Sequence, residues 1–94
     1  MRIAVVGGVE RTEGRLIDIA SRAGHELEFH HGHMSGPASQ RLQNLVERAD
    51  VIVIVTDVNS HAAVTYARDA ARRARRPVRL VRRFGSSQLK AFLN

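Results

Sequence analysis

The sequence predicts an α/β fold in which helices cover both faces of a four-stranded parallel sheet. Short apolar segments alternate with segments of helical periodicity along all 94 residues. The connections between these segments are only a few residues long, which favours right-handed crossovers between parallel strands. One segment, residues 51–55, is apolar and β-branched throughout, which is typical of a strand that is buried on both faces.

The first half of the chain contains two predicted strands and one predicted helix. Residues 2–6 form a short apolar run that ends at Gly7-Gly8, as in a buried strand. We expect Thr12 to cap the following helix and Gly24 to end it. Residues 26–30 alternate polar and apolar side chains, which indicates an edge strand with one face in water. The inner face of the helix is predicted to carry Leu16, Ile17, Ile19, Ala20 and Ala23.

The second half repeats the pattern. Pro37 fits the first turn of a second helix, and Ser60 fits the N-cap of a third helix that ends before Pro77. Residues 78–81 are predicted to form the fourth strand, and Ser86 or Ser87 is expected to cap a short last helix. The inner residues predicted for these helices are Leu42, Leu45, Val46 and Ala49; then Ala63, Val64, Ala67, Ala70, Ala71 and Ala74; and finally Leu89, Phe92 and Leu93.

The exposure expected of each strand predicts the order of the strands in the sheet. The first and third strands have the composition of fully buried strands, whereas the alternation in residues 26–30 indicates a half-exposed one. This contrast favours the order 2-1-3-4, a flavodoxin-like or Rossmann-like three-layer arrangement. Residues 1–94 contain no linker, repeat or low-complexity segment, so we expect a single domain.

The composition excludes several classes of protein. The chain has no cysteine, which excludes a disulfide scaffold, a thiolate zinc site and a cysteine nucleophile. No apolar run approaches the ~20 residues of a membrane span, and the N-terminus has no secretory signal pattern. We therefore expect a cytoplasmic protein with no membrane partner.

Charge is distributed unevenly along the chain. The net charge is +6, and residues 58–94 hold 9 basic groups and only 1 acidic group. A one-sided basic surface attracts nucleic acid or acidic partners. Fourteen of the 15 basic residues are arginine, which is also expected of a GC-rich genome. A solvated basic face is therefore the alternative interpretation.

Polar loops follow the carboxyl ends of all four predicted strands. In such sheets, ligands bind beyond these ends where the strand order reverses, which here lies between the first and third strands. The glycines after the first strand offer N–H groups to an anion, although they equally suit a tight turn. An arginine at the end of the fourth strand, beside two serines, suits phosphate or carboxylate. The predicted ligand-binding residues are Gly7, Gly8, Asp57, Ser60, Arg82, Ser86 and Ser87.

The run His-His-Gly-His at residues 30–33 is the most unusual local feature, and imidazole is a common metal ligand. The tips of the second and third strands are expected to lie roughly 10 Å apart, a gap that two histidines can nearly span. This predicts His30, His31 and His61 as ligands of a divalent metal such as zinc or iron, with Asp57 orienting His61. A structural, hydrogen-bonding role is the alternative, because the spacing matches no strict zinc pattern.

Four segments resemble those of the bacterial domain-of-unknown-function 2325 family. They are Gly7-Gly8, residues 29–32 (Phe-His-His-Gly), residues 56–61 (Thr-Asp-Val-Asn-Ser-His) and residues 82–87 with Leu89. The resemblance spans nearly the whole chain. It implies a fold and a site at these loops, and no established activity. It also implies cysteines in relatives where this chain has Ile54 and Val58.

Together these features predict a domain that binds a small anionic ligand or a metal ion at the strand-end edge. The alternative is binding of nucleic acid or an acidic partner through the arginine-rich last third. A hydrolase or transferase that uses His61 and Asp57 ranks last, because no Gly-x-Ser-x-Gly motif is present. A small aliphatic core gives only marginal stability, so we also expect self-association, as a homodimer.

Overall fold

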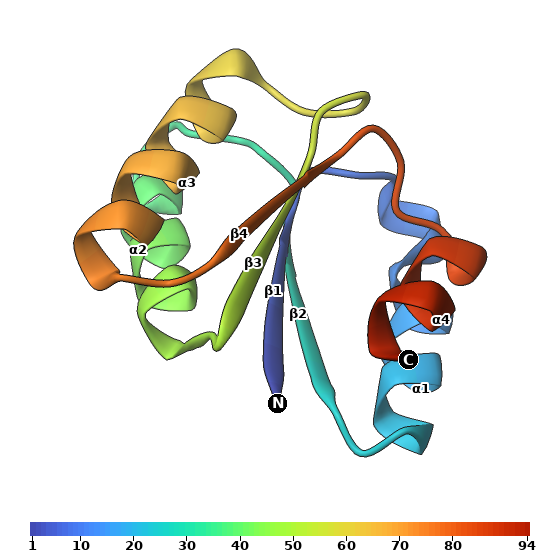
Figure 1. The fold of residues 1–94 in the computed structure, drawn as a ribbon. Helices are drawn as coiled ribbons and strands as arrows, with labels where there is room; N and C mark the ends of the chain where they lie inside the picture. Colours follow the sequence, from blue (N-terminus) through green and yellow to red (C-terminus); the bar gives the residue numbers. More distant parts are fainter.

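The computed structural model describes residues 1–94 and has three layers, with helices on both faces of one sheet (Figure 1). The strands are β1 (Arg2–Val6), β2 (Glu26–His30), β3 (Val51–Val55) and β4 (Val78–Val81). The helices are α1 (Glu13–Arg22), α2 (Ala38–Arg48), α3 (His61–Ala74) and α4 (Ser86–Leu93), and a 3₁₀ turn, η1 (Glu10–Thr12), precedes α1. None of these helices has both the length and the apolar character that crossing a membrane requires.

The sheet has the order β2-β1-β3-β4, and every pair of neighbouring strands is parallel. Val6 lies beside His30 on one side and Ile54 on the other, and Val55 lies beside Val81. All four strands therefore end at the same edge of the sheet. The predicted fold class and strand order are confirmed.

Two hydrophobic clusters fill the spaces on either side of the sheet. Ile52 and Ile54 point into the cluster formed with α2 and α3, whereas Val51, Val53 and Val55 point into the cluster formed with α1 and α4. Successive strand side chains point to opposite faces, so a strand between two helical layers must be apolar at every position. All five residues of β3 are indeed buried.

The inner face of α1 is narrower than the sequence predicted. Leu16 and Ala20 are buried, and Ile19 packs against the same cluster. Ile17 is 37% exposed, and Ala23 lies exposed beyond the end of the helix. One step along a helix turns a side chain by about 100°, so Ile17 cannot share the direction of Leu16.

The helix starts agree with the sequence at Ser60 and differ from it at the other three helices. The Ser60 hydroxyl accepts a hydrogen bond from the N–H of Ala63 at 3.0 Å, as expected of an N-cap. Pro37 was expected in the first turn of α2 and lies one residue earlier, at the N-cap. Thr12 precedes α1, but its hydroxyl donates to the carbonyl oxygen of Val9 instead of accepting from the helix. The N-cap of α4 is Gly85, so Ser86 and Ser87 are helical residues and not caps.

Candidate functional site

The crevice between the ends of β1 and β3 is filled by the side chain of Asn59. Its Nδ2 donates to the carbonyl oxygens of Val6 at 3.1 Å and of Val55 at 2.9 Å, which are the last residues of the two central strands. Its Oδ1 accepts from the N–H of Ser60 at 2.8 Å. The place where the strand order reverses is therefore closed by the chain itself.

Two glycines make room for this asparagine. A Cβ at Gly7 would lie 2.6 Å from Asn59 Nδ2, and a Cβ at Gly32 would lie 2.5 Å from Asn59 Oδ1. Both glycines also have positive φ values, 94° at Gly7 and 93° at Gly32, a conformation that other residues rarely adopt. Gly7 after β1 and Gly32 after β2 thus each allow a close approach of Asn59 and a tight turn.

The main-chain N–H groups of the predicted glycine site already have acceptors. Gly7 donates to the carbonyl oxygen of His30, and Gly8 donates to that of Val58, both at 2.7 Å. The Ser60 hydroxyl, another predicted ligand contact, donates to the carbonyl oxygen of Gly32 at 2.6 Å. These groups join the loops after β1, β2 and β3, and so are not free to hold an anion.

The two consecutive histidines at the end of β2 point to opposite sides of the sheet. His30 Nε2 lies 3.0 Å from the carbonyl oxygen of Ala38 at the start of α2. His31 Nε2 lies 2.7 Å from Glu13 Oε2 at the start of α1, and its ring stacks on Phe29. Neighbouring residues of an extended chain face opposite ways, so His30 and His31 cannot converge on one ion.

The predicted metal ligands therefore do not form a group. His61 is exposed at the start of α3, and Asp57 Oδ2 lies 3.6 Å from Arg83 Nε, so the expected pairing of Asp57 with His61 is replaced by an ion pair. No three His, Asp or Glu side chains lie close enough together to hold a metal ion. Zinc or iron binding stays a prediction, and the geometry gives it no support.

The surroundings of His30 favour its neutral form. Burial lowers the pKa of His30 below its ordinary value of 6.5, and the positive charge of Arg41 lowers it further, whereas the hydrogen bond to Ala38 acts in the opposite direction. Nδ1 accepts a hydrogen bond from the N–H of Gly32 at 3.1 Å. The proton therefore resides on Nε2, which donates to Ala38.

A groove lies at the strand-end edge, on the side of the sheet that carries α1 and α4. It consists of two adjoining hollows of about 320 Å³ and about 470 Å³, which share Thr12 and Gly85. We call it the strand-end groove. The first hollow is lined by Gly8, Val9, Thr12, Val55, Asp57, Val58, Arg82, Arg83, Phe84 and Gly85, and the second by Arg11, Thr12, Arg15, Gly85 and Ser86.

Positive charge dominates the strand-end groove. Four arginines line it against a single carboxylate, Asp57. The first turn of α4 adds to this potential, because Gly85 has no side chain with which to cap the helix. The first main-chain bond of α4 runs from the N–H of Leu89 to the carbonyl oxygen of Gly85, so the N–H groups of Ser86, Ser87 and Gln88 have no acceptor in the chain.

The structure brings some of the predicted ligand residues together and separates others. Gly8, Asp57 and Arg82 line the first hollow, and Ser86 lines the second. The lining residues do not include Gly7, Ser60, Ser87, His30, His31 or His61.

Sequence reasoning missed Arg11, Arg15 and Phe84 as lining residues, and Asn59 as the side chain that closes the crevice. The sequence did contain an indication of Arg11 and Arg15. They follow Gly8 closely and are four residues apart, a spacing that places two side chains on the same face of a helix.

Comparison with known proteins identifies relatives along the whole chain. The family model described as "Uncharacterized protein conserved in bacteria (DUF2325)" matches residues 2–94. Two UPF0751 proteins of Desulfitobacterium hafniense, from strains DSM 10664 / DCB-2 and Y51, are 28% identical to this chain over 92 residues, which is 95% of the chain and 88% of each relative. Another UPF0751 protein of strain Y51 is 32% identical over 78 residues, 78% of the chain and 71% of the relative. No solved structure matches the chain.

Proposed function

This chain belongs to the DUF2325 family of uncharacterised bacterial proteins, and we propose that it is a binding domain for a small organic anion held in the strand-end groove. The observation that supports this proposal is the charge of the lining. Arg11, Arg15, Arg82 and Arg83 line the two hollows, and only Asp57 opposes them. Arginine is the side chain best suited to phosphate and carboxylate groups, because its planar guanidinium presents several N–H donors.

The free N–H groups at the start of α4 support the same chemistry. Such groups carry partial positive charge and bind phosphate or carboxylate oxygens without any charged side chain. Here they adjoin the second hollow, which is lined by Ser86 together with Arg11 and Arg15. We therefore assign the anionic group of the ligand to the second hollow.

The first hollow suits a less polar part of the ligand. Val9, Val55, Val58 and Phe84 contribute to its lining, next to Arg82 and Arg83. Small-molecule sites commonly combine an apolar wall with a few polar groups that fix orientation. The ligand we propose is a phosphate- or carboxylate-bearing small molecule with an apolar portion that contacts Phe84.

Titration of the ¹³C,¹⁵N-labelled protein with inorganic phosphate, pyrophosphate and phenyl phosphate tests this proposal. We expect chemical-shift changes at the amides of residues 85–88, with phenyl phosphate also shifting the ring signals of Phe84. Arg11→Ala should weaken pyrophosphate binding about tenfold, which corresponds to about 1.4 kcal/mol.

Arg73→Ala is the matched control, because Arg73 is an exposed arginine of α3 on the other face of the sheet. It should leave binding unchanged. Equal weakening by both variants, or shift changes spread over the arginines of α3, would show diffuse attraction of anions and contradict a site in the strand-end groove.

A further inference from the structure

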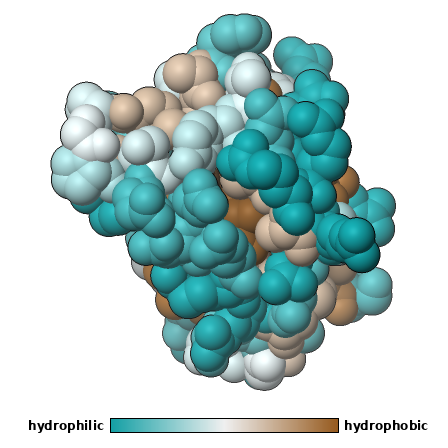
Figure 2. Space-filling model, turned by 90° about the vertical axis from the view of Figure 1, so that its left-hand side faces the viewer, coloured by the Kyte–Doolittle hydropathy of each residue, from teal (hydrophilic) through white to brown (hydrophobic).

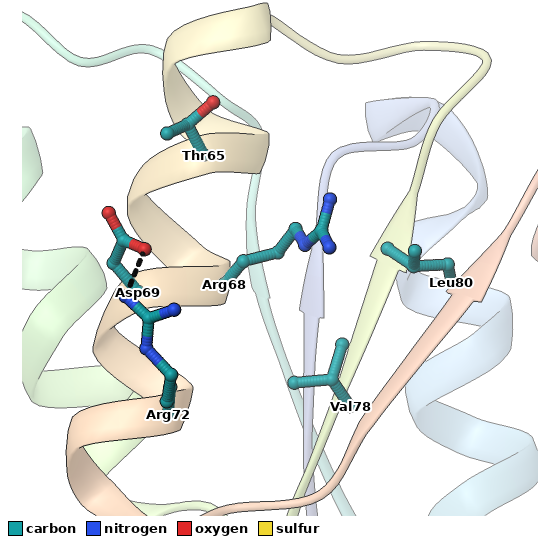
Figure 3. Close-up of a pocket in the computed structure, with 6 residues that line it drawn as sticks. All are labelled: Thr65, Arg68, Asp69, Arg72, Val78 and Leu80. Carbon is teal, nitrogen blue, oxygen red and sulfur yellow. Dashed lines mark hydrogen bonds and ion pairs between the residues drawn. The ribbon is translucent and has the colours of Figure 1, made fainter.

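A second groove lies on the opposite face of the sheet, between α3 and the free edge of β4. Its volume is about 530 Å³, and its lining residues are Thr65, Arg68, Asp69, Arg72, Val78 and Leu80 (Figure 3). We call it the edge groove. Val78 and Leu80 point from β4 toward α3, and Arg68 reaches from α3 toward the strands (Figure 3). The groove therefore combines an apolar wall with a cationic one.

Leu80 is conspicuous because it is a large apolar side chain that is 51% exposed. The side of the molecule that carries α2 and α3 is otherwise mostly hydrophilic, with a small hydrophobic area in a hollow near its middle (Figure 2). Together with Val78, the exposed side chain of Leu80 gives the edge groove an apolar wall that can contact apolar side chains of a partner.

The main chain of β4 offers hydrogen bonds at the same place. The carbonyl oxygens of Pro77 and Val81 accept from the N–H groups of Ile52 and Thr56 on the β3 side. The direction of main-chain groups alternates along a strand, so the N–H and C=O groups of Val78 and Leu80 face the free edge. The two residues whose side chains line the edge groove thus also carry the unpaired main-chain groups.

Charge indicates the sign of the partner. Arg72 pairs with Asp69 at 3.0 Å, whereas Arg68 has no carboxylate partner. Between residues 68 and 76, in α3 and just beyond its end, the chain has five arginines and a single acidic residue, Asp69. A partner that covers this edge must therefore bring negative charge.

We propose that the β4 edge and the edge groove bind an acidic segment of another protein in extended conformation, which joins the sheet as a fifth strand. Main-chain hydrogen bonds to Val78 and Leu80 would hold the segment in register. Its apolar side chains would contact Leu80, and its carboxylates would pair with Arg68 and neighbouring arginines. This interaction is separate from anion binding in the strand-end groove, which lies on the other face.

Two other occupants fit the edge less well. A second copy of this chain, joined edge to edge through β4, would bring two sets of the same arginines together, and like charges across an interface oppose association. Single-stranded nucleic acid is usually held by exposed aromatic rings on which bases stack. Tyr66, the aromatic residue of α3, is half-buried and donates its hydroxyl hydrogen bond to Gln43 Oε1, so it offers no such platform.

The test uses fluorescein-labelled peptides in which Glu or Asp alternates with Val, Ile or Leu. Each peptide has about ten residues, which is near the upper limit of the usual length of a β-strand. Fluorescence anisotropy should show binding of these peptides to the protein. Hydrogen exchange should show new protection of the Leu80 amide on binding, because that N–H faces the free edge. The Val81 amide, which faces β3, should change little.

Leu80→Ser and Arg68→Glu should each weaken peptide binding about tenfold or more. Lys90→Glu is the charge control, because Lys90 is exposed on α4 at the opposite face, and it should have a much smaller effect. A peptide of the same sequence that is N-methylated at every main-chain amide, and so has no N–H to donate to the strand edge, should not bind.

Several outcomes would overturn the proposal. Failure of all the alternating peptides to bind is one, and binding without protection of the Leu80 amide is another. Tighter binding of a single-stranded DNA oligonucleotide than of any peptide would assign the surface to nucleic acid. A dimer that Leu80→Ser dissociates, and that peptide does not displace, would assign it to a second copy of the chain.

Discussion

At the scale of single residues, His30 is the one polar residue among the buried side chains of this protein. Its neutral form satisfies both ring nitrogens, since Nε2 donates to Ala38 and Nδ1 accepts from Gly32. A second proton would have to sit on Nδ1, where it would face the N–H of Gly32. Protonation of His30 in the folded state therefore costs both desolvation and a hydrogen bond.

We predict that the protein loses stability as the pH falls below about 6.5, the ordinary pKa of histidine. Burial lowers the pKa of His30 in the folded state, so the unfolded chain binds this proton more readily and acid favours unfolding. The loss should begin at the unfolded pKa and stop once the pH is below the folded pKa. Urea unfolding measures this loss of stability when it is repeated from pH 8 to pH 5 in steps of about one pH unit.

His30→Gln should be less stable at neutral pH, because a buried hydrogen-bonded group is replaced, but its stability should depend less on pH. His61→Gln is the control, because His61 is exposed at the start of α3, and this variant should keep the full pH dependence. If His30→Gln retained the slope of the unmodified protein, the pH dependence would have to come from another group.

The residues of the candidate site could be predicted only in part. The sequence located the four loops, and Gly8, Asp57, Arg82 and Ser86 do line the strand-end groove. The divergence of His30 and His31 was predictable from strand alternation, which a search for clustered imidazoles overlooks. The role of Asn59 was not predictable in this way, because it depends on the distance between the ends of β1 and β3.

At the scale of helices and strands, Ser60 links two parts of the strand-end edge. Its hydroxyl accepts from the N–H of Ala63 in the first turn of α3 and donates to the carbonyl oxygen of Gly32 in the loop after β2. A cap of α3 is thereby also a tie between the loops on either side of β1. Thr12, at the corresponding position before α1, makes no such cap.

We predict that Ser60→Ala destabilises the protein by about 1–2 kcal/mol, because it removes an N-cap and a second hydrogen bond. Thr12→Ala should cost less than about 0.5 kcal/mol, because it removes one exposed hydrogen bond that satisfies no helical N–H. Urea unfolding of both variants with an unchanged m-value measures these differences. Equal losses would mean that the Ser60 cap does not stabilise α3.

The sequence predicted the strands more accurately than the helix ends. All four strands have the expected bounds, because apolar runs between two layers leave little freedom in their placement. The start of α4 was misplaced because serine is a strong N-cap residue in general. In the structure, the side chain of Gln88 accepts from the N–H of Gly85 at 2.9 Å. The helix begins at Ser86, whereas a Ser86 cap would make Ser87 its first residue.

At the scale of the whole molecule, the two hydrophobic clusters are separated by the sheet but share its central strands. β1 and β3 each send alternate side chains into both clusters. Neither cluster can therefore loosen without exposing strands on which the other depends. This arrangement favours cooperative unfolding of residues 1–94, as small domains usually show.

Leu16→Ala tests that cooperativity. Leu16 is 1% exposed in the cluster beneath α1 and α4, and such a substitution costs about 2–5 kcal/mol, a large share of the stability of a small domain. Tyr66 reports on the opposite cluster, against which it packs. In Leu16→Ala, we expect the urea midpoint of unfolding to fall by the same amount whether it is followed by Tyr66 fluorescence or by far-ultraviolet circular dichroism. Ile17→Ala, one residue along and 37% exposed, should shift both only slightly. A Tyr66 transition that stayed in place while the circular dichroism moved would show that the two faces of the sheet unfold independently.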